Sequence, residues 1–280
     1  MQVQWYPGHM AKAKRIMQDD VRLVDMVIEL VDARAPLSSR NPDIDKLGGG
    51  KFRLVLLNKA DLADERINRK WKAYFEAQGV ACLCLDSRVS SVKKAVTDSI
   101  MKVAAAKFER DRARGILNRP VRVMVCGIPN VGKSTLINTI AGRASAKTGD
   151  KPGVTKANQW IKLNKQVELL DTPGLLWPKF EDMRVGERLA IMGSINDDIL
   201  EKRELAACLL GILKKSYPEA VTTRYGVGCE EDNYKQLEMI AIARNALKKG
   251  AEPDIDKASK LIIDDFRAGR LGRISLEEPL

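Results

Sequence analysis

A short loop between an apolar run and the start of a helix constrains the fold of this chain more than any other feature. Residues 121–126 form the run VRVMVC, which predicts a buried strand, and GIPNVGKS follows from Gly127 to Ser134. Glycines let backbone N–H groups turn inward, and a helix start favours negative charge. The sequence therefore predicts a phosphate-binding loop, in which Lys133 reaches the phosphates and the Ser134 hydroxyl ligates Mg²⁺. The alternative is an ordinary glycine turn. We call residues 127–134 the phosphate loop.

Other apolar runs alternate with helical patterns along the first part of the chain. Strands are predicted at residues 27–31, 53–57, 80–85, 121–126, 158–163 and 166–170, and helices at 64–78, 89–108 and 134–141. A charge-rich stretch at 107–119 is predicted to be a connector. Strands that alternate with helices indicate an α/β domain, with a mainly parallel sheet flanked by helices.

The pattern changes after Pro178. Helices are predicted over 183–215, 233–249 and 254–268, separated by SYPEA, YGVGCEED and GAEPD, with no strong strand pattern. We therefore predict two domains: residues 1–178 form the α/β domain with an N-terminal extension, and residues 179–280 form a small all-α domain.

Composition excludes several protein classes. The chain has 280 residues, of which 45% are hydrophobic and 30% charged, as in soluble globular proteins. No apolar run approaches the roughly 20 residues that cross a bilayer, and the N-terminus lacks the apolar stretch of a secretory signal. The five cysteines form no C-x-x-C pair, which argues against a zinc site or a disulfide framework. We expect a soluble cytoplasmic protein with no membrane partner.

The tetrapeptide NKAD, residues 58–61, directly follows the apolar run RLVLL. A carboxylate there can accept hydrogen bonds from the ring N–H and the exocyclic amine of guanine, whereas adenine offers neither donor in that arrangement. A buried carboxylate left unpaired disfavours the wrong base. The segment resembles the N-K-x-D motif of GTPases, and this resemblance implies that Asp61 binds guanine, Lys59 packs over the base and Asn58 is tied to the phosphate loop. Taken alone, the tetrapeptide is also compatible with a polar turn.

A second resemblance to GTPases lies at residues 171–174, DTPG, which begin at the last residue of the run VELLD. It resembles the D-x-x-G motif, which implies that Asp171 holds Mg²⁺ through water and that the Gly174 amide senses the γ-phosphate. Thr155 matches the switch threonine that completes the Mg²⁺ shell. Ser87 lies where GTPases carry a base-contacting loop, although the usual S-A-K is not present. Further contacts with GTP or GDP are expected from Asn130, Val131, Gly132, Lys133, Ser134 and Thr135.

These segments occur in an unusual order. In Ras-like proteins the phosphate loop comes first, whereas here N-K-x-D and the base loop precede it. The chain is therefore predicted to be a circularly permuted Ras-like domain, a rearrangement that compact domains tolerate because their ends often lie close together. The permutation places D-x-x-G at the exit of the α/β domain, so that movement controlled by the γ-phosphate passes directly into the helical domain.

With this order, the segment DARAP, residues 32–36, resembles the YlqF-related family of circularly permuted GTPases. WYPGHMAKA from Trp5, DTPGLLWP from Asp171 and DFRAGRLG from Asp265 also match this family, and the resemblance covers nearly the whole chain. It implies a GTPase that acts in late assembly of the large ribosomal subunit, binds ribosomal RNA and leaves after GTP hydrolysis. A monomer is expected in solution.

The glutamine that orients the attacking water in Ras-like enzymes is replaced here by Leu175. Intrinsic hydrolysis should therefore be slow. The resemblance assigns water positioning to His9, so the expected catalytic residues are His9, Lys133, Thr155 and Gly174. Two alternatives for His9 are an RNA contact and a solvated residue of the N-terminus. Several GTPases with asparagine at the position of Asn130 bind K⁺ beside the phosphates, which predicts K⁺ stimulation. The alternative is that Asn130 caps a loop amide.

The formal net charge of +11 favours an acidic partner such as RNA. The candidates for RNA phosphate contacts are Lys12, Lys14, Arg15, Arg22, Lys107, Arg110, Arg112, Arg114, Arg119, Arg122, Arg143, Lys147, Lys151, Lys156, Lys162, Lys165, Lys248, Lys249, Lys257, Lys260, Arg267, Arg270 and Arg273. Each run is also compatible with a solvated face. Trp177 and Phe266 are expected in the core rather than stacked on bases.

Two other functions stay open at this point. Leu175 is compatible with an RNA-anchored GTP/GDP sensor that hydrolyses negligibly. A GTPase that acts on transfer RNA or in translation would carry the same motifs.

Overall fold

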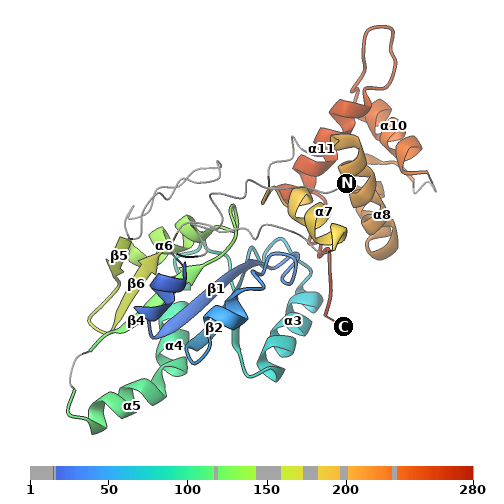
Figure 1. Cartoon of the computed structure of the whole chain (residues 1–280). Coiled ribbons are helices and arrows are strands. Elements are labelled where there is room, and N and C mark those ends of the chain that lie inside the picture. Colours follow the sequence, from blue (N-terminus) through green and yellow to red (C-terminus); the bar gives the residue numbers. More distant parts are fainter. Residues whose placement is uncertain are drawn as a thin grey trace.

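The computed structural model describes residues 15, 17–116, 119–142, 159–172, 182–195, 201–228 and 232–279 (Figure 1). Predictions that lie outside these residues concern His9, Thr155, Gly174, Leu175, Trp177, Lys12, Lys14, Arg143, Lys147, Lys151 and Lys156. Within the described ranges, no helix is both long and apolar enough to span a membrane.

A six-stranded sheet forms the centre of the first half of the chain. Its strands are β1 (Met26–Asp32), β2 (Phe52–Asn58), β3 (Ala81–Cys84), β4 (Val121–Cys126), β5 (Gln159–Lys162) and β6 (Val167–Asp171), in the order β3-β2-β1-β4-β6-β5. Only the pairing of β5 with β6 is antiparallel among those described. The strands lie where the apolar runs predict them, and the mainly parallel sheet is confirmed.

The central strands are buried because helices flank the sheet. All seven residues of β1 are buried, as are the last five of β2. Such continuous apolar runs are typical of parallel strands that are covered on both faces. The connecting helices are α2 (Ile44–Leu47), α3 (Glu65–Ala77), α4 (Val92–Val103), α5 (Ala105–Ala113) and α6 (Lys133–Ala141).

The prediction of one helix over 89–108, followed by a connector from residue 107, is wrong. Two helices, α4 and α5, meet at Ala104, and the charged stretch continues as helix to residue 113. Lys107 explains the difference, because its ammonium pairs with Asp111 one turn later at 2.6 Å and lies 3.9 Å from Asp25. Lys107 is only 2% exposed, so its expected contact with RNA is also wrong.

The second half of the described chain is helical. It consists of α7 (Met183–Ile191), α8 (Lys202–Ser216), α9 (Pro218–Tyr225), α10 (Asn233–Ala243) and α11 (Ile255–Arg267), and α8 contacts the other four (Figure 1). All three predicted ranges contain helix, but 183–215 is divided between α7 and α8, and α10 and α11 are shorter than predicted. Gly193 ends α7 in the left-handed conformation, with φ of +75°. The segment SYPEA is not a separator, because Pro218 begins α9, where its missing N–H is not needed.

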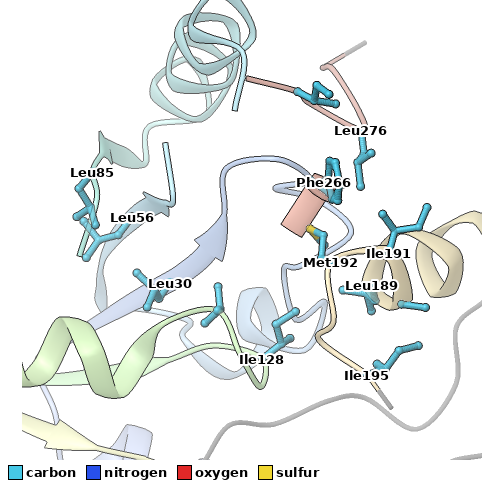
Figure 2. Close-up of a cluster of buried hydrophobic side chains, with 14 of the residues drawn as sticks. Leu30, Leu56, Leu85, Ile128, Leu189, Ile191, Met192, Ile195, Phe266 and Leu276 are labelled. Carbon is cyan, nitrogen blue, oxygen red and sulfur yellow. The ribbon is translucent and has the colours of Figure 1, made fainter. Parts of the chain in front are cut away.

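A continuous apolar cluster connects the sheet with the helical half. It includes Leu30 and Leu56 from the strands and Leu189 and Phe266 from the helices, and Figure 2 shows these side chains around the loops that follow the strands. Phe266 is 2% exposed, which confirms its expected place in the core. The division of the chain at residue 178 stays a prediction.

The end of the described chain returns to the α/β half. Residues 272–279, which we call the C-terminal strap, run from the helical half toward α3 (Figure 1). Ile274 N donates to Leu62 O at 2.9 Å, and Leu276 N donates to Arg34 O at 2.7 Å. The Glu277 carboxylate accepts hydrogen bonds from the backbone and hydroxyl of Ser38 at 3.0 and 2.6 Å. The strap thus packs against the loops that follow β1 and β2.

Candidate nucleotide-binding site

The predicted site residues within the described chain gather at one edge of the sheet. The strands β1, β2, β3, β4 and β6 are parallel, so their carboxyl ends lie together. Asp32 ends β1, Asn58 ends β2, Asp171 ends β6, and the phosphate loop follows β4. In open α/β sheets, ligands bind outside the carboxyl ends of the strands.

Asn58 joins three of these loops. Its side chain is 1% exposed, and Nδ2 donates to Val131 O in the phosphate loop at 2.7 Å. Its Oδ1 accepts from Ser87 N in the base loop at 2.9 Å. A Cβ on Gly132 would lie 2.4 Å from Asn58 Nδ2, and Gly132 has φ of +95°, so only glycine fits at this close approach. These segments are far apart in sequence and form one hydrogen-bonded unit.

Lys59 is held between the phosphate loop and a buried carboxylate. Its Nζ donates to Asn130 O at 2.8 Å and lies 3.1 Å from Asp32 Oδ2. Arg34 pairs with the same carboxylate through Nε and Nη2, at 2.9 and 2.8 Å. Although burial raises the pKa of Asp32, the charges of Arg34 and Lys59 outweigh it and hold that pKa far below its ordinary value. Asp32 is therefore ionised and fixes the position of Lys59.

Asp61 presents a carboxylate whose two oxygens differ. Oδ2 accepts from Arg88 Nη2 at 2.6 Å, whereas Oδ1 is buried and has no partner in the described part of the chain. An unpaired buried oxygen is costly. The N–H groups of guanine are donors of the kind that this atom lacks.

Lys133 and Asp171 are buried together at the other end of the site. Lys133 donates to the backbone oxygen of Thr172. Burial lowers the pKa of Lys133 to about 8, against the opposing charge of Asp171. Burial also raises the pKa of Asp171, and its Oδ1 has no partner among the described residues. Neither charge is fully compensated by the described residues, which is the condition expected where phosphate and a cation bind.

The remaining residues of the phosphate loop surround the start of α6. Val131 is buried, while Ser134 and Thr135 are half-buried in the first turn of the helix. Asn130 is exposed, has φ of +60°, and donates through Nδ2 to Gly193 O at 2.8 Å. The contact that the structure gives the Asn130 side chain is therefore to the end of α7 rather than to a loop amide.

Sequence patterns predict no role in the site for three residues that lie near it. Asp32 and Arg34 belong to the DARAP segment of the family, and Arg88 lies in no motif. Among the basic residues assigned to RNA, Arg270 pairs with the buried Asp265 at 2.5 Å, and Arg273 donates to Asp61 O at 3.1 Å. Asp265 lies five residues before Arg270, and Asp61 lies 212 residues before Arg273, so charge runs alone could not separate these arginines from solvated cations.

Comparison with known proteins agrees with this geometry. The family described as "50S ribosome-binding GTPase" matches residues 122–228. Ribosome biogenesis GTPase A of Bacillus cereus is 47% identical over 280 residues, which cover 100% of this chain and 95% of the relative. A GDP-bound structure of YlqF aligns with a TM-score of 0.68 at 29% identity, covering 95% of this chain and 99% of that chain. GNP-bound YlqF from T. maritima aligns with a TM-score of 0.67 at 30% identity, covering 96% and 98%.

The similarity extends over the whole chain, the sheet has the expected permuted order, and the segments at its carboxyl edge match those of guanine-nucleotide-binding proteins. The chain therefore belongs to the family of ribosome biogenesis GTPase A, the circularly permuted GTPases related to YlqF, and is a GTP hydrolase that acts in ribosome biogenesis.

Proposed function

We propose that this GTPase binds a precursor of the large ribosomal subunit, promotes its late assembly, and leaves after GTP hydrolysis that the particle stimulates. The family description "50S ribosome-binding GTPase" supports the large subunit as the partner. The net charge of +11 supports contact with ribosomal RNA, because cations that neutralise RNA phosphates supply affinity without reading sequence. Exposed candidates for these contacts are Arg110, Arg112, Arg114, Lys248, Lys249 and Lys257.

The observation that carries the nucleotide assignment is the pair of hydrogen bonds made by Asn58. They connect the N-K-x-D segment to the phosphate loop and to Ser87, so a single nucleotide can touch all three. In this site Asp61 accepts hydrogen bonds from guanine, Lys59 packs over the base, and residues 130–135 bind the phosphates with Lys133.

Mg²⁺ fits the phosphate end of the site. The buried Oδ1 of Asp171, which has no partner within the described part of the chain, and the hydroxyl of Ser134 are oxygen donors of the kind that Mg²⁺ prefers. When bound, Mg²⁺ would neutralise charge on the phosphate oxygens. Asp171 would act through water and Ser134 directly. We also assign Thr155 to the Mg²⁺ shell and the Gly174 amide to the γ-phosphate, although both residues lie outside the described ranges.

The groups that position water and neutralise the transition state are proposed from the family resemblance. Leu175 cannot orient water, so we assign that role to His9, which also lies outside the described residues. The Nδ2 of Asn130 donates to Gly193 O, and we assign its side-chain oxygen to K⁺ beside the phosphates. We expect the protein to be a monomer that works in the cytoplasm.

Nucleotide selectivity tests the site directly. Asn at position 61 would present an amide donor to the C2 carbonyl of xanthine in place of the carboxylate that accepts from the guanine amine. Asp61→Asn should therefore lose about 100-fold or more in affinity for GDP and gain affinity for XDP, measured by calorimetry. Wild-type protein that binds ADP as tightly as GDP would overturn the assignment.

Stimulation by the particle is a separate measurement. GTP turnover by wild type and His9→Ala should be compared with and without large-subunit particles, in K⁺ and in Na⁺. We expect particles to accelerate the wild type in K⁺ and His9→Ala to lose that acceleration. No acceleration of the wild type would favour a nucleotide sensor, and equal rates in K⁺ and Na⁺ would remove the role of K⁺.

A further inference from the structure

Arg88 links the carboxylate of Asp61 to a second carboxylate, that of Asp86. Its guanidinium forms a fork on Asp86, with Nε 2.9 Å from Oδ1 and Nη2 2.9 Å from Oδ2. The backbone N of Arg88 also donates to Asp86 Oδ1 at 3.0 Å. The Nη2 group also donates to Asp61 Oδ2 at 2.6 Å. Asp86 thus fixes the guanidinium from one side, and the guanidinium contacts Asp61 on the other.

Asp61 can accept from Arg88 and from guanine at the same time. An ionised carboxylate offers about four acceptor positions, two on each oxygen. Arg88 uses one position on Oδ2, and Oδ1 has no partner within the described ranges. Guanine requires one position on each oxygen, so base binding does not require Arg88 to leave.

We propose that Asp86 and Arg88 form a clip that determines base specificity, because it fixes the plane of the Asp61 carboxylate for two-point recognition of guanine. The inference rests on the proposed role of Asp61. Arg88 is a positioning residue here, since it acts on the base through Asp61 and not by contact with the nucleotide.

The clip predicts a specific pattern of base discrimination. Two parallel hydrogen bonds from guanine are formed well only when the carboxylate plane matches the base edge. Inosine lacks the exocyclic amine and makes one such bond, which tolerates rotation of the carboxylate. Loss of the clip should therefore weaken the binding of GDP more than the binding of IDP.

The test measures affinities of GDP and IDP by calorimetry for wild type, Arg88→Ala, Asp86→Asn and the double variant. Arg88→Ala should lose about fivefold in GDP affinity, the scale of an exposed ion pair, while IDP affinity stays within about twofold. Asp86→Asn releases the guanidinium from the other end and should give a similar selective loss. Because both act through one clip, the double variant should lose no more than Arg88→Ala.

Arg184→Ala is a matched control. Arg184 makes the same local fork on Asp182, two residues before it, with N, Nε and Nη2 at 2.9, 3.1 and 2.9 Å from the carboxylate. This fork lies at the start of α7, and Arg184 forms no hydrogen bond or ion pair with Asp61 in the described part of the chain. The affinities for GDP and IDP should therefore be unchanged.

Three outcomes would overturn the clip. Unchanged or tighter GDP binding by Arg88→Ala would make Arg88 a bystander or a competitor of guanine, and equal losses for GDP and IDP would reduce it to a support of the loop. Additive losses in the double variant would separate Asp86 from Arg88. A failure of the underlying site is distinguishable, because it would appear in wild type as binding of ADP as tight as that of GDP.

Discussion

The base side and the phosphate side of this site treat buried charge differently. On the base side, the Asp32 carboxylate pairs with both Arg34 and Lys59, at 2.8 and 3.1 Å, and Asn58 makes its hydrogen bonds within the protein, although burial lowers the pKa of Lys59. On the phosphate side, burial lowers the pKa of Lys133 and raises that of Asp171. Asp32, Arg34 and Lys59 therefore form ion pairs with one another, whereas Lys133 and Asp171 form no such pair among the described residues.

This difference predicts which substitutions should lower the unfolding free energy and which should lower the rate of GTP hydrolysis. A buried charge that forms ion pairs stabilises its partners. Its removal therefore leaves those partners charged and buried with no opposite charge nearby. A buried charge without an ion-pair partner destabilises the folded state, and binding of an oppositely charged ligand removes this destabilisation. The two sides should therefore respond to substitution in opposite ways.

The largest effect is expected from Asp32→Asn. This change leaves Arg34 and Lys59 without their buried partner, and we expect a loss of about 3–5 kcal/mol in unfolding free energy from urea titration. Asp45→Asn is the control, because Asp45 also pairs with two arginines, Arg40 and Arg53, but its side chain is 53% exposed. It should cost about 1 kcal/mol or less. Equal losses for the two variants would show that Asp32 is not a structural charge.

On the phosphate side, Lys133→Met should lower the rate of GTP hydrolysis. Loss of one positioned cation at the transferring phosphate typically costs about 100- to 1,000-fold in turnover, so we expect a fall of that order in steady-state GTP hydrolysis. Lys94→Met removes an exposed lysine from α4 and should keep the wild-type rate. Turnover by Lys133→Met within threefold of wild type would contradict the role of Lys133.

The same variant should make the nucleotide-free protein more stable, with a defined pH dependence. The pKa of Lys133 is lowered from 10.5 to about 8, so the unfolded chain binds more protons between these values. The destabilisation by charged Lys133 is complete below pH 8 and disappears as pH rises toward 10.5. Lys133→Met should therefore gain about 2–3 kcal/mol over wild type at pH 7 and less at pH 9.5. A gain that does not shrink with pH would have another cause.

The smallest effect tests the C-terminal strap that supports the base side. Glu277→Ala removes the acceptor of Ser38 N and Oγ, and of Arg188 at 2.8 Å. Loss of these partly buried bonds should cost about 1–3 kcal/mol of unfolding free energy and weaken GDP binding. Glu278→Ala is the neighbouring control, since Glu278 is exposed and pairs only with Lys70 among the described residues. If both variants unfold like wild type, the strap does not support the site.

Sequence patterns predicted most of the sheet and much of the site, because both depend on local signals. Apolar runs locate strands buried on both faces, and the carboxyl-edge rule brings Asn58, Lys133 and Asp171 together once those strands are parallel. The phosphate loop carries its own glycines and helix start. These features need no knowledge of distant contacts.

The contacts that complete the site depend on distant residues and could not be predicted in this way. Arg88 reaches Asp61 across 27 positions, and the strap reaches Ser38 across 239. Nothing local separates Arg88 or Glu277 from an ordinary surface charge. The start of α9 is different in kind: the segment SYPEA predicts a break, although proline is well placed in the first turn of a helix.

The strap also has a consequence for the order in which the molecule is made. Leu62 and Arg34 are synthesised before the helical half, yet their carbonyl groups accept hydrogen bonds from Ile274 and Leu276, which are translated after it. Contacts of such large sequence separation form late in folding. The guanine-recognition loops of a nascent chain therefore lack this support until the strap has been translated, and a chain that stops before Ile274 cannot form these hydrogen bonds.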